Sequence, residues 1–180
     1  MRAVNSRVTG GEFRGREIFT PLNSVTHPMG SRERLALMNS IGAKRSFSGA
    51  RVLDAYAGTG ALGLEALSRG AREVIFVEKN RKALVALAEN IANFGVEEVS
   101  GIVAGDVAMF STAEKFEIIF VDPPYNNFQI EEFCHLAEFL TKDGLLAVSH
   151  PEEEPVEFEG VELVSDKKYA RARIAIFEKS

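Results

Sequence analysis

A glycine-rich turn between an apolar strand and a helix constrains the fold of this 180-residue chain more than any other feature. Residues 51–56 read as a short buried strand, and Gly58, Gly60 and Gly63 follow at the spacing Gly-x-Gly-x-x-Gly. Glycine lets the backbone approach a ligand closely, and this pattern opens dinucleotide-binding α/β folds. The turn therefore predicts a site for NAD or another adenosyl cofactor.

The rest of the chain alternates strands and helices, which predicts a parallel, doubly wound sheet. Further strands are expected at 73–77, 100–104, 117–121 and 144–149. Asn80 is expected to cap one helix, and another is expected from Gln129 with Ile130, Phe133, Ala137 and Leu140 inward. Residues 161–164 and 172–177 are separated by a linker too short for a crossover helix, so they are expected to pair as an antiparallel hairpin.

The first fifty residues are expected to add a small basic extension. Residues 3–8 and 13–19 read as a β-hairpin around Gly10-Gly11, and Ser31 is expected to cap a helix with Leu35, Met38 and Ile41 on one face. Residues 1–51 carry nine Lys or Arg and three Glu, a net charge of +6, whereas the whole chain has −5. We interpret 1–48 as an RNA-contacting extension of a core at 49–180, the alternative being a solvated surface. The candidate phosphate contacts are Arg14, Arg16, Arg32 and Arg34.

Four acids follow apolar strands and are expected to meet at the carboxyl edge of the sheet, where ligands bind in such folds. Asp54 precedes the glycine turn, where it could face the cationic amino-acid part of S-adenosylmethionine (SAM). Glu78 lies about twenty residues further on, where an acid contacts ribose hydroxyls. Asp106 is either a ligand contact or a helix cap. SAM is favoured over NAD because the chain leaves no room for a dehydrogenase substrate domain.

The run Asp122-Pro123-Pro124-Tyr125 predicts chemistry on an amino group of a flat ring. A carboxylate and a backbone carbonyl can accept the two N–H bonds of an exocyclic amine, and an aromatic face can hold the ring. Asp122, the carbonyl of Pro123 and Tyr125 could supply these parts, and the prolines restrict the local torsions. The alternative is a strand followed by a plain X-Pro-Pro turn.

The composition argues against disulfide bonds, metal sites and membrane insertion. Cys134 is the single cysteine and excludes an intramolecular disulfide, while three histidines without cluster spacing predict no zinc site or other metal. No run approaches the ~20 apolar residues of a membrane span, and the first twenty residues lack a signal-peptide core. We therefore expect a cytoplasmic protein without a membrane partner.

Over nearly its full length the chain resembles the RsmD family of bacterial methyltransferases. The resemblance is carried by residues 54–71 and 122–125, by 9–16 near the amino terminus, and by Lys168-Tyr169 before the last strand. One segment departs from the family pattern: residues 27–34 read His-Pro-Met-Gly-Ser-Arg-Glu-Arg where Arg-Pro-Thr-x-Asp-Arg-x-Arg is usual, so the acidic residue is missing near Ser31.

The resemblance implies a Rossmann-like class I methyltransferase fold, a mostly parallel seven-stranded sheet ending in an antiparallel hairpin. It implies methyl transfer from SAM to N2 of a guanine in 16S ribosomal RNA, with free RNA or a small-subunit assembly intermediate as partner. A monomer is expected. Gly58 and Gly60 would border the methionine part of SAM, and Asp106 with Val107 would meet the adenine. The cofactor residues implied are Asp54, Ala57, Gly58, Gly60, Glu78, Lys79, Asp106 and Val107, and the catalytic ones are Asp122, Pro123, Pro124 and Tyr125.

Three other functions remain open on the residues. A DNA adenine-N6 methyltransferase would use the same Asp-Pro-Pro-Tyr chemistry but normally needs a sequence-reading domain as well. A protein glutamine methyltransferase would resemble this core but typically carries Asn at position 122. A SAM-fold RNA-binding module without catalysis would not need Asp122.

Overall fold

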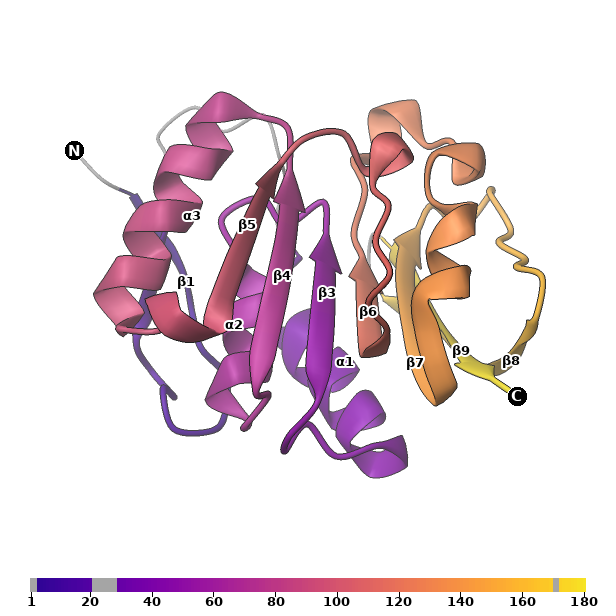
Figure 1. The fold of residues 1–180 in the computed structure, drawn as a ribbon, viewed down its shortest axis with the longest axis horizontal. Helices are drawn as coiled ribbons and strands as arrows, with labels where there is room; N and C mark the ends of the chain where they lie inside the picture. The colour runs from indigo at the N-terminus through magenta and orange to yellow at the C-terminus, as the bar shows by residue number, and fades with distance from the viewer. Residues whose placement is uncertain (1–2, 21–28, 170–171) are drawn as a thin grey trace.

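The computed structural model describes residues 3–20, 29–169 and 172–180. Seven strands form one sheet in the order β5-β4-β3-β6-β7-β9-β8 (Figure 1). The first five strands of that order are parallel, whereas β9 runs antiparallel to both β7 and β8. This confirms the predicted fold class and the terminal hairpin. The strands are β3 (Arg51–Ala55), β4 (Glu73–Glu78), β5 (Ser100–Ala104), β6 (Phe116–Val121), β7 (Leu140–His150), β8 (Val161–Tyr169) and β9 (Ala172–Lys179).

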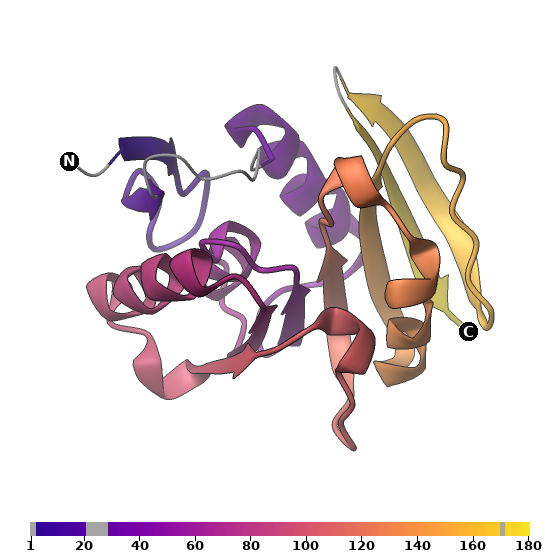
Figure 2. The ribbon, with the colours of Figure 1, turned by 90° about the horizontal axis from the view of Figure 1, so that it is seen from above.

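Strict alternation along the central strands builds a core on each face of the sheet. In β6, for example, Ile118 and Phe120 pack on one face, and Ile119 and Val121 pack on the other. The first face is covered by α1 (Ser31–Lys44), α2 (Ala61–Ser68) and α3 (Arg81–Phe94), as Figure 2 shows. Both faces are therefore apolar, which is why these strands read as continuous hydrophobic runs.

A two-stranded hairpin, β1 (Ala3–Arg7) with β2 (Glu17–Thr20), lies on the same side as these helices. Val8 and Ile18 join the hydrophobic core on this face of the sheet. Asn90 on α3 fastens the second strand, because its Oδ1 accepts from the N–H of Phe19 at 2.9 Å and its Nδ2 donates back to the Phe19 carbonyl at 3.0 Å. The predicted hairpin is confirmed, with a shorter second strand.

Helix α3 begins as predicted. The side chain of Asn80 accepts from the N–H groups of Lys82 and Ala83 at 2.9 and 3.1 Å. The helix ends at Gly95, whose φ of 66° is a left-handed conformation that glycine adopts without steric cost.

The start of α1 differs from the prediction. Ser31 is the first helical residue, and Gly30 occupies the cap position, where its N–H donates to Glu33 Oε2 at 2.9 Å. Leu35 is 39% exposed, while Arg34 and Leu37 face the interior together with Met38 and Ile41. The buried stripe is thus shifted because a buried carboxylate, described below, draws Arg34 inward.

The α-helix expected from Gln129 to Leu140 is wrong. The chain forms short 3-10 segments, η4 (Ile130–Glu132) and η5 (Cys134–Phe139), and Leu140 already begins β7. The largest buried side chains here are Phe133, Leu136 and Phe139, which recur every three residues. That spacing matches the three residues per turn of a 3-10 helix. With η2 (Val107–Met109), these segments cover the second face of the sheet (Figure 2).

Two further 3-10 turns, η1 (Glu97–Val99) and η3 (Tyr125–Asn127), complete the elements of the described residues. Within the described ranges, no helix combines the length and apolar composition needed to cross a bilayer.

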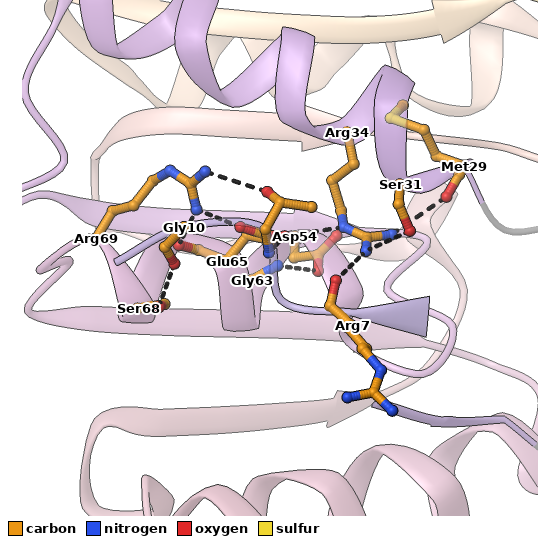
Figure 3. Close-up of polar contacts among 11 residues, drawn as sticks. Arg7, Gly10, Met29, Ser31, Arg34, Asp54, Gly63, Glu65, Ser68 and Arg69 are labelled. Atoms are coloured by element: carbon orange, nitrogen blue, oxygen red, sulfur yellow. Dashed lines mark hydrogen bonds and ion pairs between the residues drawn. The ribbon is translucent and has the colours of Figure 1, made fainter. Parts of the chain in front are cut away.

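A buried charge cluster joins the amino-terminal segment to α2 (Figure 3). Glu65 is fully buried and pairs with Arg34, also fully buried, at 3.1 Å, and with Arg69. It also accepts from the N–H of Thr9 at 2.6 Å. The Arg34 guanidinium additionally donates to the carbonyls of Arg7 and Met29 at 2.8 and 3.2 Å. Buried charges persist only when paired and hydrogen-bonded, so this cluster fixes where the amino-terminal segment meets the core.

Candidate active site

Four carboxylate side chains lie at the carboxyl edge of the parallel strands. Asp54 is the penultimate residue of β3, and Glu78 ends β4. Asp106 follows β5, and Asp122 directly follows β6. Because these four strands are neighbours and parallel, their ends meet on one edge of the sheet. The structure therefore brings together the four acids that the sequence predicts to share this edge.

Asp54 is almost fully buried beneath the glycine turn. Its Oδ2 accepts from the N–H of Gly63 at 2.8 Å, which satisfies a free donor in the first turn of α2. Burial raises the pKa of Asp54 well above its usual range, and the charges of Asp122 and Glu78 raise it further, while the hydrogen bond from Gly63 opposes the shift. Such a group gains free energy from a nearby cation, which restores its ionised form.

The glycines of the turn have different roles. A Cβ on Gly60 would lie 2.5 Å from Leu87 Cδ1, and one on Gly63 would lie 2.2 Å from the ring of Phe76, so these two allow close packing of α2. Gly58 has φ of 57°, and a Cβ there would meet only the Tyr56 carbonyl at 4.0 Å. The backbone at Gly58 thus faces open space, as a ligand-binding backbone requires.

Glu78 connects the turn to α3. Its Oε2 accepts from the N–H of Gly58 at 2.8 Å, and its Oε1 accepts from the N–H of Asn80 at 2.7 Å. A carboxylate has about four lone-pair sites, so each oxygen keeps one acceptor position. The side chain can therefore hold the turn and still receive two hydroxyl groups.

Asp106 occupies the helix-cap position, one of the two roles that the sequence leaves open. Its carboxylate accepts from the N–H of Ala108 at 3.2 Å as the cap of η2, and it pairs with Lys79 at 2.9 Å. The hydrogen bond from Lys79 is the main reason that the pKa of Asp106 lies below its usual value. Val107 and Ala57 are buried, so any ligand contact from them comes through backbone or through a small apolar surface.

The Asp-Pro-Pro-Tyr run leaves the sheet at the end of β6 and leads into η3. Asp122 is half-buried, Pro123 is buried, and Pro124 and Tyr125 are exposed. Burial raises the pKa of Asp122 to about 6, and the carboxylate of Glu33 on α1 adds to that shift, while a hydrogen bond from Ser149 opposes it. Burial also raises the pKa of Tyr125 to about 12. Above pH 6 the site therefore holds an ionised carboxylate beside a neutral phenol.

Ser149 and Glu33 join this site although sequence reasoning missed them. Ser149 bonds to the Tyr125 hydroxyl as well as to Asp122. A signal for Ser149 was available, because it is the first polar side chain after the apolar run 145–148 in the strand that follows Asp122. Glu33 had no such signal, since it belongs to an amphipathic helix with charges on several faces.

The four arginines predicted to contact RNA have different environments. Arg14 and Arg32 are exposed. Arg16 is also exposed, but its guanidinium stacks 4.3 Å from the centroid of Phe94 and donates to the Asn93 carbonyl at 2.5 Å. The prediction that Arg34 contacts RNA phosphate is wrong, because the Arg34 side chain is fully buried in the charge cluster with Glu65. His27 and Pro28, which begin the segment that departs from the family pattern, lie outside the described residues.

Comparisons with known proteins agree with this geometry. The chain is 34% identical over 148 residues to ribosomal RNA small subunit methyltransferase D of Escherichia coli K12, covering 79% of this chain and 73% of that one. It is 30% identical to YlbH of Bacillus subtilis, a candidate rRNA methyltransferase by name, over 96% and 98% of the two chains. The solved structure of YhhF from E. coli, a candidate methyltransferase, superposes with a TM-score of 0.85 at 28% identity, over 97% and 98% of the chains.

Fold and site together define a Rossmann-like methyltransferase that depends on SAM. More narrowly, the chain belongs to the family described as Conserved hypothetical protein 95, the RsmD family, which matches residues 6–178.

The residues at the carboxyl edge fit SAM. SAM carries two cationic groups, a sulfonium and an ammonium. The buried Asp54, whose pKa is raised, lies beside the further acids Asp122 and Glu78, so the site can receive positive charge. The open space beside Gly58 permits close approach of a ligand, and the remaining acceptor positions of Glu78 suit a ribose diol. We therefore assign this edge as the candidate SAM site.

Glu78→Ala is expected to weaken SAM binding by about 1.5 to 3 kcal/mol, the range for hydrogen bonds to a charged group. The loss has two sources, because the carboxylate holds Gly58 and would accept from the ribose. Isothermal titration calorimetry measures the change, and Glu97→Ala, at an exposed acid before β5, serves as the control. Unchanged affinity in a folded Glu78→Ala protein would remove this residue from the site, and tight NADH binding by the wild type would overturn the cofactor assignment.

Proposed function

We propose that this protein transfers a methyl group from SAM to the exocyclic N2 amine of a guanine in the 16S RNA of the small ribosomal subunit. The observation that carries the proposal is the Asp-Pro-Pro-Tyr run directly after β6, on the same edge as Asp54 and Glu78. The relatives named ribosomal RNA small subunit methyltransferase D support the choice of RNA. The enzyme acts in the cytoplasm as a monomer, on free RNA or on an assembling subunit.

The protein's part in the reaction is alignment of a weak nucleophile. SAM supplies an already activated methyl group, so little covalent chemistry is left to the side chains. Asp122 and the Pro123 carbonyl accept the two N–H bonds of the amine, which directs its lone pair at the methyl carbon. Tyr125 offers a partly exposed ring as a stacking face for the base.

Asp122 also provides a place for the departing proton. A base amine is too weak an acid to lose its proton before attack, but it becomes a strong acid once the methyl group has been added. With a pKa of about 6, the Asp122 carboxylate is mostly ionised at neutral pH, and this pKa is close enough to the surrounding pH for the carboxylate to accept that proton.

The decisive experiment for this function is mass mapping of methylated nucleotides in ribosomal RNA from a strain lacking the gene. The proposal expects one N2-methylguanine in the small-subunit RNA to disappear and to return with the wild-type gene. A methylation lost from DNA or protein, with the ribosomal RNA unchanged, would assign the site to another substrate.

The amino-terminal segment 1–48 is proposed to contact the RNA through its exposed arginines. Replacing Arg14, Arg16 and Arg32 together with glutamine is expected to weaken RNA binding and flatten its salt dependence by up to about 0.7 to 0.9 in logarithmic slope per lost phosphate contact. Binding measured at several salt concentrations tests this. Arg72→Gln, at an exposed arginine beside the amino end of β4, should leave the slope unchanged. A triple variant with normal slope and affinity would show that this segment is only a solvated surface.

A further inference from the structure

A buried hydroxyl group lies between the two functional side chains of the Asp-Pro-Pro-Tyr run. Ser149 is only 3% exposed and is the next-to-last residue of β7. The parallel register pairs Val121 of β6 with Val148 of β7, so the following residues, Asp122 and Ser149, lie side by side where the strands end. Both belong to the face covered by α1, since Phe120 and Ala147, two residues earlier, pack there.

The hydrogen bonds of Ser149 have a defined direction. An ionised carboxylate only accepts hydrogen bonds, so the Ser149 hydroxyl donates to Asp122. Having one proton, Ser149 then accepts from the Tyr125 hydroxyl, with which it is also bonded. The order is therefore Tyr125 to Ser149 to Asp122, and the phenol hydroxyl is directed into the protein while the ring remains partly exposed.

We propose that Ser149 is a positioning residue that holds the Asp122 carboxylate and the Tyr125 ring in the orientation needed for methyl transfer. The proposal rests on the assignment of these two residues to the amine site. One hydroxyl fixes both the acceptor of the amine N–H and the plane on which the base stacks. A chain of this kind reduces the side-chain freedom that the site must otherwise lose when substrate binds.

The same hydrogen bond controls the charge on Asp122. The groups that face Asp122 are Asp54 from β3, Glu33 from α1, and Tyr125 and Ser149. Burial disfavours the negative charge on Asp122 most strongly, and the Glu33 carboxylate adds to that effect. Ser149 opposes them, so losing its hydroxyl raises the pKa of Asp122 and keeps the carboxyl protonated to higher pH.

The test compares Ser149→Ala with Ser149→Thr, which retains a hydroxyl, and with Ser100→Ala. Ser100 is a matched control, because its buried hydroxyl on β5 has no hydrogen-bond partner among the described residues. The primary readout is the ¹³C chemical shift of the Asp122 carboxyl group as a function of pH, in protein without substrate. Ser149→Ala is expected to move this titration upward by about one pH unit, and the other two variants much less.

Single-turnover methyl transfer provides the second readout. Below the pKa of Asp122 the rate follows the ionised fraction of its carboxyl group. The ratio of the wild-type rate to the Ser149→Ala rate should therefore be up to about tenfold larger near pH 5.5 than near pH 8.5. Tyr125→Phe keeps the ring and the bond from Ser149 to Asp122, but it loses the bond that orients the ring. It should therefore lower the rate on the high-pH plateau without shifting the fall in rate at acidic pH.

A Ser149→Ala protein with an unchanged carboxyl titration would overturn the proposal, even if its activity or stability fell. The titration needs no substrate, so it separates this inference from the proposed function. If the wild type methylated no RNA, the proposed function would fail, while the titration would still decide whether the Ser149 hydroxyl acts on the Asp122 carboxyl group.

Discussion

Replacing Asp122 with alanine is expected to slow single-turnover methyl transfer by at least about a hundredfold, the effect of removing one positioned acid–base group. The carboxylate lies at the end of β6, and its raised pKa of about 6 places it near the working pH. SAM affinity should change much less, because Glu78 and the turn at Gly58 carry those contacts and bond to each other rather than to Asp122.

The separation of rate from binding is the informative part of this experiment. Asp166→Ala is a suitable control, since that carboxylate lies on β8 and pairs with Arg173 on β9. SAM binding by calorimetry shows that each variant is folded and loaded. Near-normal turnover in Asp122→Ala would contradict the proposed role of the carboxylate, and a parallel loss of SAM affinity would reassign Asp122 to the cofactor.

Arg34→Ala is expected to lower the free energy of unfolding by about 3 to 5 kcal/mol. The change removes one of the two arginine partners of the buried Glu65 and leaves the carbonyls of Arg7 and Met29 without their donor. It also loosens the contact between the amino-terminal segment and α2 (Figure 3). Urea unfolding followed by circular dichroism measures the difference.

Arg32→Ala is the matched control, because it lies two residues away on the same helix with an exposed side chain. Its free energy of unfolding should stay within about 0.5 kcal/mol of the wild type. The order of the two effects is reversed in RNA binding, because Arg32→Ala removes an exposed arginine and should weaken the affinity directly. Equal stability of the two variants would show that the buried cluster contributes little to the fold.

The sequence by itself determined the architecture because its signals are local. Each signal lies within a short stretch of sequence. Examples are the alternation of apolar strands with helices, the Asn80 cap and the glycine spacing after β3. Parallel strands must bring their carboxyl ends to one edge, so the meeting of Asp54, Glu78 and Asp122 followed from element order alone. The glycines could be located but not distinguished, since only the neighbours of Gly60 and Gly63 show that they serve packing.

The tertiary structure decided the environment of each side chain. Arg34 and Arg32 look alike in sequence, yet only Arg34 has a carboxylate, 31 residues away in the chain, placed inside the fold to receive it. Ser149 and Tyr125 meet across 24 residues because β7 is added beside β6 in one register. The choice of 3-10 turns over an α-helix at 130–139 depends on how Phe133, Leu136 and Phe139 meet the second face of the sheet. Burial and hydrogen bonding depend on which distant residues become neighbours, and sequence periodicity carries no information about that.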